Sequence, residues 1–176
     1  MKKSLVSVFT TCLLISGCAI NAPTESVYED NLVREGNSTE IPEETTANNE
    51  ASGVTAVSAN ENTDGSYIFS VTIASDETGC DRYANWWEVI TEDGTLLYRR
   101  ILAHSHVDEQ PFTRSGGPVE IDADEVVILR SHMHPTGYHT QVMQGSFTEG
   151  FESISLPADF ATELAEVEPL PSGCTF

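Results

Sequence analysis

Apolar and polar residues alternate in short runs over most of the segment 53–150. The clearest run is 67–74, where Tyr67, Phe69, Val71 and Ile73 alternate with residues that include a serine and a threonine. Successive side chains of a strand point to opposite faces, so this pattern predicts strands with one buried face. We expect seven strands, at 54–60, 67–74, 85–91, 96–104, 118–121, 126–134 and 141–147.

Turn signals separate these runs at short intervals, as at Asp64-Gly65 and at Pro135-Thr136-Gly137. Because no helical stretch of useful length interrupts the strands, the sequence predicts an all-β fold over 53–150. The number and spacing of the strands favour a single antiparallel sandwich of the immunoglobulin or fibronectin-III type. Trp86 and Trp87 are adjacent and should face opposite ways, one in the core and the other under a loop or exposed for contact.

Composition changes on both sides of this segment. Residues 18–52 hold eight acids, one arginine and one aromatic residue, and such a stretch cannot bury enough apolar surface to fold. We therefore expect a disordered, extended acidic tether at 18–52. Residues 151–176 are expected to form a C-terminal tail, with one or two helical turns at 159–166 that end before Pro169.

The chain is strongly acidic, with 28 Asp and Glu against 8 Lys and Arg and a formal charge of −20. A surface this negative repels phosphate backbones, which argues against nucleic-acid binding. Mutual repulsion also favours a soluble monomer.

The first eighteen residues have the order of a secretory signal. Lys2 and Lys3 precede an apolar stretch at 4–15, and Ile15-Ser16-Gly17-Cys18 follows. This ending resembles the lipobox of bacterial lipoproteins. The resemblance implies removal of 1–17, attachment of a diacylglycerol and fatty acid such as palmitate to Cys18, and anchoring of the chain in a membrane of the cell envelope. The alternative is an ordinary secretory signal with a chance cysteine.

The residue after Cys18 is Ala19. In a Gram-negative source, the absence of aspartate at that position implies the outer membrane. Of the other cysteines, Cys12 lies in the signal, which leaves Cys80 and Cys174. An even pair in an oxidising compartment predicts a disulfide that pins the C-terminal tail. Two free thiols are the alternative.

All five histidines lie between residues 104 and 139, and four of them form the pairs His104/His106 and His132/His134. Residues i and i+2 of a strand face the same side, so each pair can present two imidazoles to one point. Copper or zinc binds such an arrangement. If the strands alternate in direction, both pairs lie at the same end of the sheet. The alternative is that they are polar residues at strand ends.

No nucleophile elbow, zinc-protease motif or phosphate-binding loop occurs in the chain. Glu109, near His104 and His106, is the one candidate general base for a metal-dependent hydrolase, and we do not expect an enzyme. The sequence favours a membrane-anchored, non-enzymatic binding or structural module that contacts a protein or glycan through the loops at 105–117 and 135–140. The alternative is an envelope copper- or zinc-binding protein.

Overall fold

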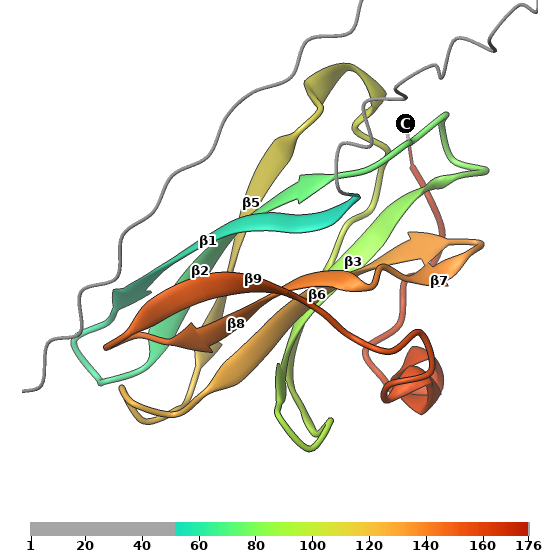
Figure 1. Ribbon diagram of the computed structural model, residues 1–176. Coiled ribbons are helices and arrows are strands. Elements are labelled where there is room, and N and C mark those ends of the chain that lie inside the picture. The colour runs from blue at the N-terminus through green and yellow to red at the C-terminus, as the bar shows by residue number, and fades with distance from the viewer. Residues whose placement is uncertain (1–51, 176) are drawn as a thin grey trace, which may run out of the picture. The chain divides into compact units, whose positions relative to one another are not determined.

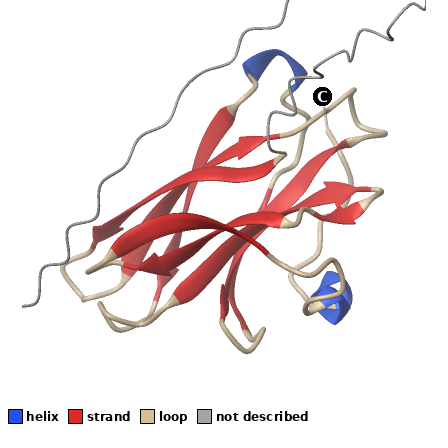
Figure 2. Ribbon diagram, in the orientation of Figure 1, coloured by secondary structure: helices blue, strands red, loops and turns tan. Residues whose placement is uncertain are grey.

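The alternating runs form the strands of one continuous sheet in a computed structural model, which describes residues 52–175 (Figures 1 and 2). The predictions for residues 1–51, including lipid attachment at Cys18 and the acidic tether, lie outside the described residues. The strands are β1 (Gly53–Glu61), β2 (Tyr67–Ala74), β3 (Tyr83–Thr91), β4 (Leu96–Ile101), β5 (Phe112–Val119), β6 (Val127–His134), β7 (Gly137–Tyr138), β8 (Gln141–Ser146) and β9 (Gly150–Ser155). Two short 3-10 helices are η1 (Val107–Glu109) and η2 (Thr162–Glu166).

The all-β prediction is confirmed, but the immunoglobulin or fibronectin-III type is not. The hydrogen-bonded order is β4-β3-β6-β8-β1-β2-β5, with β7 beside β6 and β9 beside β8. The strands therefore form a single sheet that curls toward a barrel. One parallel pair, Gly53 with Gln141, joins its two parts. A Cβ on Gly53 would lie 2.3 Å from the Gln141 carbonyl oxygen, so only glycine allows this approach.

Three strands differ from the prediction: β5 is misplaced in it, and β9 and the two-residue β7 are absent from it. The segment 105–117 was expected to be a loop, yet β5 begins at Phe112 and pairs with β2 alone. A strand with one neighbour tolerates glycine and proline, and Gly116 lies so close to Tyr98 that a Cβ would come within 2.7 Å of its hydroxyl. The strand β9 pairs with β8 beyond the expected end of the sheet at 150.

The interior of the curled sheet holds the main core. Trp87 is fully buried there, as are Phe69, Ile73 and Leu129. Phe69 and Ile73 lie on β2, where buried and partly exposed residues alternate. Trp87 and Leu129 lie on β3 and β6, which are buried on both faces. Burying both faces of β3 and β6 requires a second layer outside the sheet.

The C-terminal segment, residues 156–170, supplies that outer layer. Its Leu164 and Phe160 pack against Ile90, Ile128 and Val142 on the outer face. The expected helix at 159–166 is only the 3-10 helix η2. None of the helices in residues 52–175 has the length and apolar character needed to cross a membrane.

Candidate functional site at the loop pole

Four segments meet at one end of the sheet, and we call them together the loop pole: residues 75–82, 102–111, 135–140 and 171–175. Both β4 and β6 run antiparallel to β3, so they run in the same direction and end there. The two histidine pairs therefore lie at the same end of one sheet. His104 and His106 follow β4, His132 and His134 belong to β6, and β3 lies between these two strands.

The histidine pairs do not converge. His132 stacks on Trp86 with ring centroids 3.7 Å apart, and its Nδ1 lies 2.7 Å from Asn85 Oδ1. His134 is exposed and lies 6.0 Å from the ring of Tyr83. Burial is the main reason that the pKa of His132 falls to about 3, so its ring is neutral at pH 7.

The rings of His104 and His106 lie 4.6 Å apart, between centroids. His106 is buried and stacks on Phe112 at 3.9 Å, and neither of its ring nitrogens has a hydrogen-bond partner. Its Nδ1 is 4.0 Å from the carboxylate of Glu77. Burial, aided by the nearby Arg114, lowers the pKa of His106.

Within 52–175, no three side chains of His, Cys, Asp or Glu gather closely enough to hold a metal ion. The expected site of His104, His106, His132 and His134 is thus not assembled. One histidine of each pair is instead stacked on a different aromatic ring, His106 on Phe112 and His132 on Trp86. Glu109, the candidate base, forms an ion pair of 2.6 Å with Arg114, which lowers the pKa of its carboxyl.

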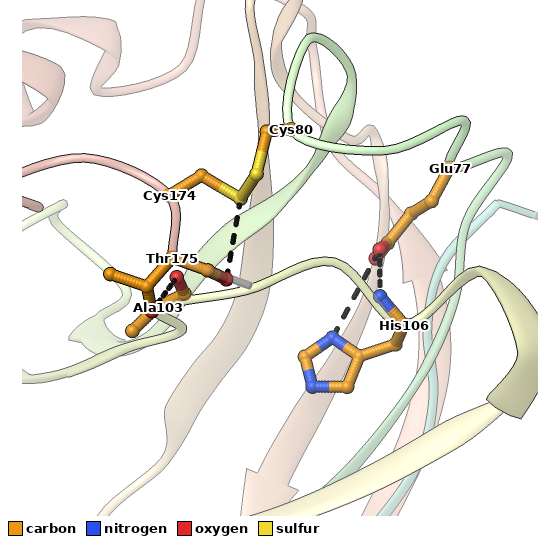
Figure 3. The surroundings of a disulfide bond; sticks show 6 residues. All are labelled: Glu77, Cys80, Ala103, His106, Cys174 and Thr175. Atoms are coloured by element: carbon orange, nitrogen blue, oxygen red, sulfur yellow. Dashed lines mark hydrogen bonds and ion pairs between the residues drawn. A yellow bond between two sulfur atoms is a disulfide. The ribbon is translucent and has the colours of Figure 1, made fainter.

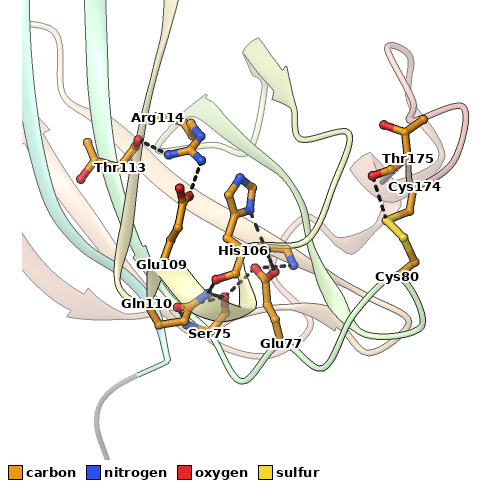
Figure 4. Close-up of polar contacts among 11 residues, drawn as sticks. Ser75, Glu77, Cys80, His106, Glu109, Gln110, Thr113, Arg114, Cys174 and Thr175 are labelled. Carbon is orange, nitrogen blue, oxygen red and sulfur yellow. Dashed lines mark hydrogen bonds and ion pairs between the residues drawn. A yellow bond between two sulfur atoms is a disulfide. The ribbon is translucent and has the colours of Figure 1, made fainter.

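A buried carboxylate that sequence reasoning missed holds two of the pole segments together (Figure 4). Glu77 accepts hydrogen bonds from the Ser75 hydroxyl at 2.9 Å, from the Ala84 amide at 3.2 Å and from the His106 amide. Three donors on one buried carboxylate offset its loss of hydration. A single glutamate in so acidic a chain carries no signal that would identify it in advance.

The C-terminal residues 174 and 175 link two other segments of the loop pole (Figure 3). Cys80 and Cys174 form a disulfide, with their Cα atoms 5.5 Å apart. The Thr175 amide donates to the carbonyl of Ala103 at 2.6 Å. With the Glu77–His106 contact, segments 75–82, 102–111 and 171–175 are each joined to the other two.

Two hollows lie among these linked segments. One, of about 460 Å³, is lined by Gly79 and by residues 104–109. The other, of about 210 Å³, is bordered by the disulfide itself. It is lined by Cys80, Tyr83, Asn85, His134, Pro171, Gly173 and Cys174.

A second polar group lies under the C-terminal segment. Glu88 is fully buried between Arg99 and Arg130, at 2.6 and 2.8 Å. Arg130 also donates to the carbonyls of Phe160 and Ala161. The two arginines thus donate to backbone carbonyls of the C-terminal segment, and these hydrogen bonds fix the outer layer to the sheet.

Trp86 lies beside this group and is almost completely buried, whereas Trp87 is in the main core. The guanidinium carbon of Arg99 lies 4.6 Å from the centre of the Trp86 ring. The two tryptophans face opposite sides, as expected, and neither is exposed for contact with a partner.

Comparison with known proteins gives one informative relative. Over 96 residues the chain is 38% identical to a protein of Halomicrobium mukohataei named "Putative lipoprotein". The match covers 52% of this chain and 47% of that protein, so the chain spans about half the length of the curated relative. No family model matches, and no solved structure matches. The relative's name gives no support for an outer-membrane location.

Proposed function

We propose that this protein is a lipoprotein of the cell envelope, anchored in a membrane through a lipid on Cys18. The observation that carries the proposal is its similarity to the Halomicrobium mukohataei protein named "Putative lipoprotein". The order of charged, apolar and small residues before Cys18 supports it independently. Several acyl chains on one residue bind a membrane firmly, since each buried CH₂ contributes about 0.8 kcal/mol.

Lipid attachment is tested by expressing the full chain with an alkyne analogue of palmitate. We expect the label on the wild-type protein, which should partition into the detergent phase of Triton X-114. Cys18→Ala should lose both properties. Cys12→Ala, which alters a cysteine within the signal, should keep them. Label and partitioning that survive Cys18→Ala would overturn the proposal.

We further propose that residues 52–175 form a non-enzymatic binding or structural module that contacts a protein or glycan through the loop pole. The disulfide, the Glu77 carboxylate and the Thr175–Ala103 contact hold three of the four pole segments together at the end of the sheet. Loops fixed in this way are where such scaffolds carry binding. Two hollows open between them.

Photo-crosslinking in cells tests the location of this contact. A photoreactive residue replaces Val107, which is 45% exposed at the loop pole, or Val126, which is 37% exposed at the other end of the sheet. We expect discrete crosslinked products from position 107 and none from position 126. Equal products from both positions, or products from 126 alone, would contradict a role for the loop pole.

A further inference from the structure

The smaller hollow at the loop pole contains a polar residue placed by an irregularity in the sheet. In the pairing of β3 with β6, Ala84 faces Met133 and Trp86 faces His132, which leaves Asn85 as the extra residue of a β-bulge. Asn85 is 4% exposed and lines the hollow. A bulge changes the direction of a side chain, and here the asparagine lines a hollow that the disulfide also lines.

His132 fixes the orientation of the Asn85 amide. The Asn85 Oδ1 can only accept, so the neutral His132 donates from Nδ1 across 2.7 Å. The stack on Trp86 holds the imidazole in place. With Oδ1 engaged, the free part of the amide is Nδ2. It has no partner within residues 52–175 and is not sealed from solvent, so it is available in the hollow.

Tyr83 provides a second donor. Its side chain is almost completely buried, yet its hydroxyl has no protein partner in the described part of the chain and is not sealed off. Burial raises the pKa of Tyr83, with a contribution from Glu77, so the hydroxyl stays protonated and can donate. His134, paired with Tyr83 across the strands, stands at the rim. The other walls are Pro171, Gly173 and the disulfide.

We propose that this hollow binds an uncharged N-acyl group, whose carbonyl oxygen accepts from Asn85 Nδ2 and the Tyr83 hydroxyl. The two donors belong to side chains that are almost completely buried, and both need an acceptor in the hollow. The negative charge of the chain, with Glu77 near Tyr83, disfavours an anionic one. The methyl or methylene next to the carbonyl fits against Pro171 and the disulfide. Such a group occurs on N-acetylated amino sugars and on acylated peptides.

This inference rests on the proposed binding role of the loop pole and names the chemistry that one part of it recognises. It is independent of lipid attachment at Cys18. The protein for its test is therefore the mature chain with Cys18→Ser and the disulfide intact, labelled with ¹⁵N.

Amide shifts are followed during titration with N-acetylglucosamine, with N-acetylalanine methylamide and with glucose, which lacks the acyl group. We expect one or both N-acyl compounds to shift Tyr83, Asn85 and Gly173, with a Kd on the order of millimolar for ligands of this size. A response to the sugar alone or to the peptide alone identifies the source of the group. Glucose should leave these amides unchanged.

Tyr83→Phe removes the hydroxyl and keeps the buried ring, and it should weaken binding by about two- to tenfold, as loss of one hydrogen bond does. Tyr98→Phe, outside the hollow, should leave the Kd unchanged. Equal shifts with glucose, or no shifts at the hollow, would overturn the inference. Shifts confined to residues 104–109 would also overturn it, while leaving the role of the loop pole intact.

Discussion

Glu88 is the fully buried acid that pairs with both arginines under the C-terminal segment. Its carboxylate is the counter-charge for Arg99 and Arg130, and all three side chains are buried. Glu88→Gln leaves two buried guanidinium groups without a charged partner, so we expect the free energy of unfolding to fall by about 3–5 kcal/mol. Urea denaturation measures this loss. Glu152→Gln on the exposed face of β9 should change stability by less than about 0.5 kcal/mol.

A small loss of stability in Glu88→Gln would contradict this prediction. Breaking a buried ion pair is costly because the remaining charge is stranded. A loss below about 1 kcal/mol in Glu88→Gln would therefore mean that the arginines find other acceptors. The carbonyls of Leu164 and Val167, which already accept from Arg99, are the nearest candidates.

The histidines lead to a prediction about metal binding. His132 donates to Asn85, and the rings of the two pairs are packed on different aromatic residues. Titration of Cu²⁺ and Zn²⁺ against a competing chelator should thus reveal only weak binding by surface carboxylates. His104→Ala and His132→Ala should leave that binding unchanged. A stoichiometric submicromolar site that either substitution removes would contradict this prediction.

At the scale of elements, the disulfide ties the C-terminal segment to the loop before β3. Cys80 and Cys174 are separated by 94 residues, and in the chain-entropy model closing a loop of that length stabilises the fold by about 4–5 kcal/mol. We expect Cys80→Ser with Cys174→Ser to lower the urea midpoint accordingly. Reduction of the wild-type protein should have the same effect and should leave the double variant unchanged.

Strands with regular alternation could be predicted from the sequence, and irregular ones could not. The boundaries of β2 agree with the prediction at both ends because its inward residues are all apolar. By contrast, β5 contains Gly116, Gly117 and Pro118, which are typical of loops. Only its position at the end of the strand order and the contact of Gly116 with Tyr98 explain why these residues form a strand.

The closure of the sheet lay beyond the reach of local patterns for a related reason. A single glycine contact, Gly53 with Gln141, joins the two parts of the sheet. The outer layer depends on carbonyls of 156–170 that bind Arg99 and Arg130. Such long-range contacts have no periodic signature in the sequence. Local patterns could therefore predict an all-β fold with many short strands, but not the way in which the sheet closes.

At the scale of the whole molecule, the location of the candidate site was more predictable than its chemistry. Strand alternation correctly placed both histidine pairs at one end. The side chains that line the smaller hollow depend on a bulge at Asn85, which exists only in the register of β3 with β6. Histidine spacing suggested metal ligands. The structure instead makes His132 the residue that orients an amide.

Three histidines also make stability depend on pH, of which His106 is buried and His132 and His139 are partly buried. Burial is the largest cause of the lowered pKa of His106, His132 and His139, and His132 falls to about 3. Below the ordinary pKa of 6.5 the unfolded chain binds protons at these histidines, whereas the folded chain does not. Their contribution to the free energy of unfolding is therefore fully present above pH 6.5 and decreases as the pH falls toward 3. We expect a loss of about 1–3 kcal/mol between pH 7.5 and 5.5, before most carboxylates titrate. Urea midpoints at the two pH values measure it. His139→Gln should reduce the loss, and the exposed His104→Gln should not. A stability that rises on acidification over this range would show that the buried rings gain their protons in the folded state.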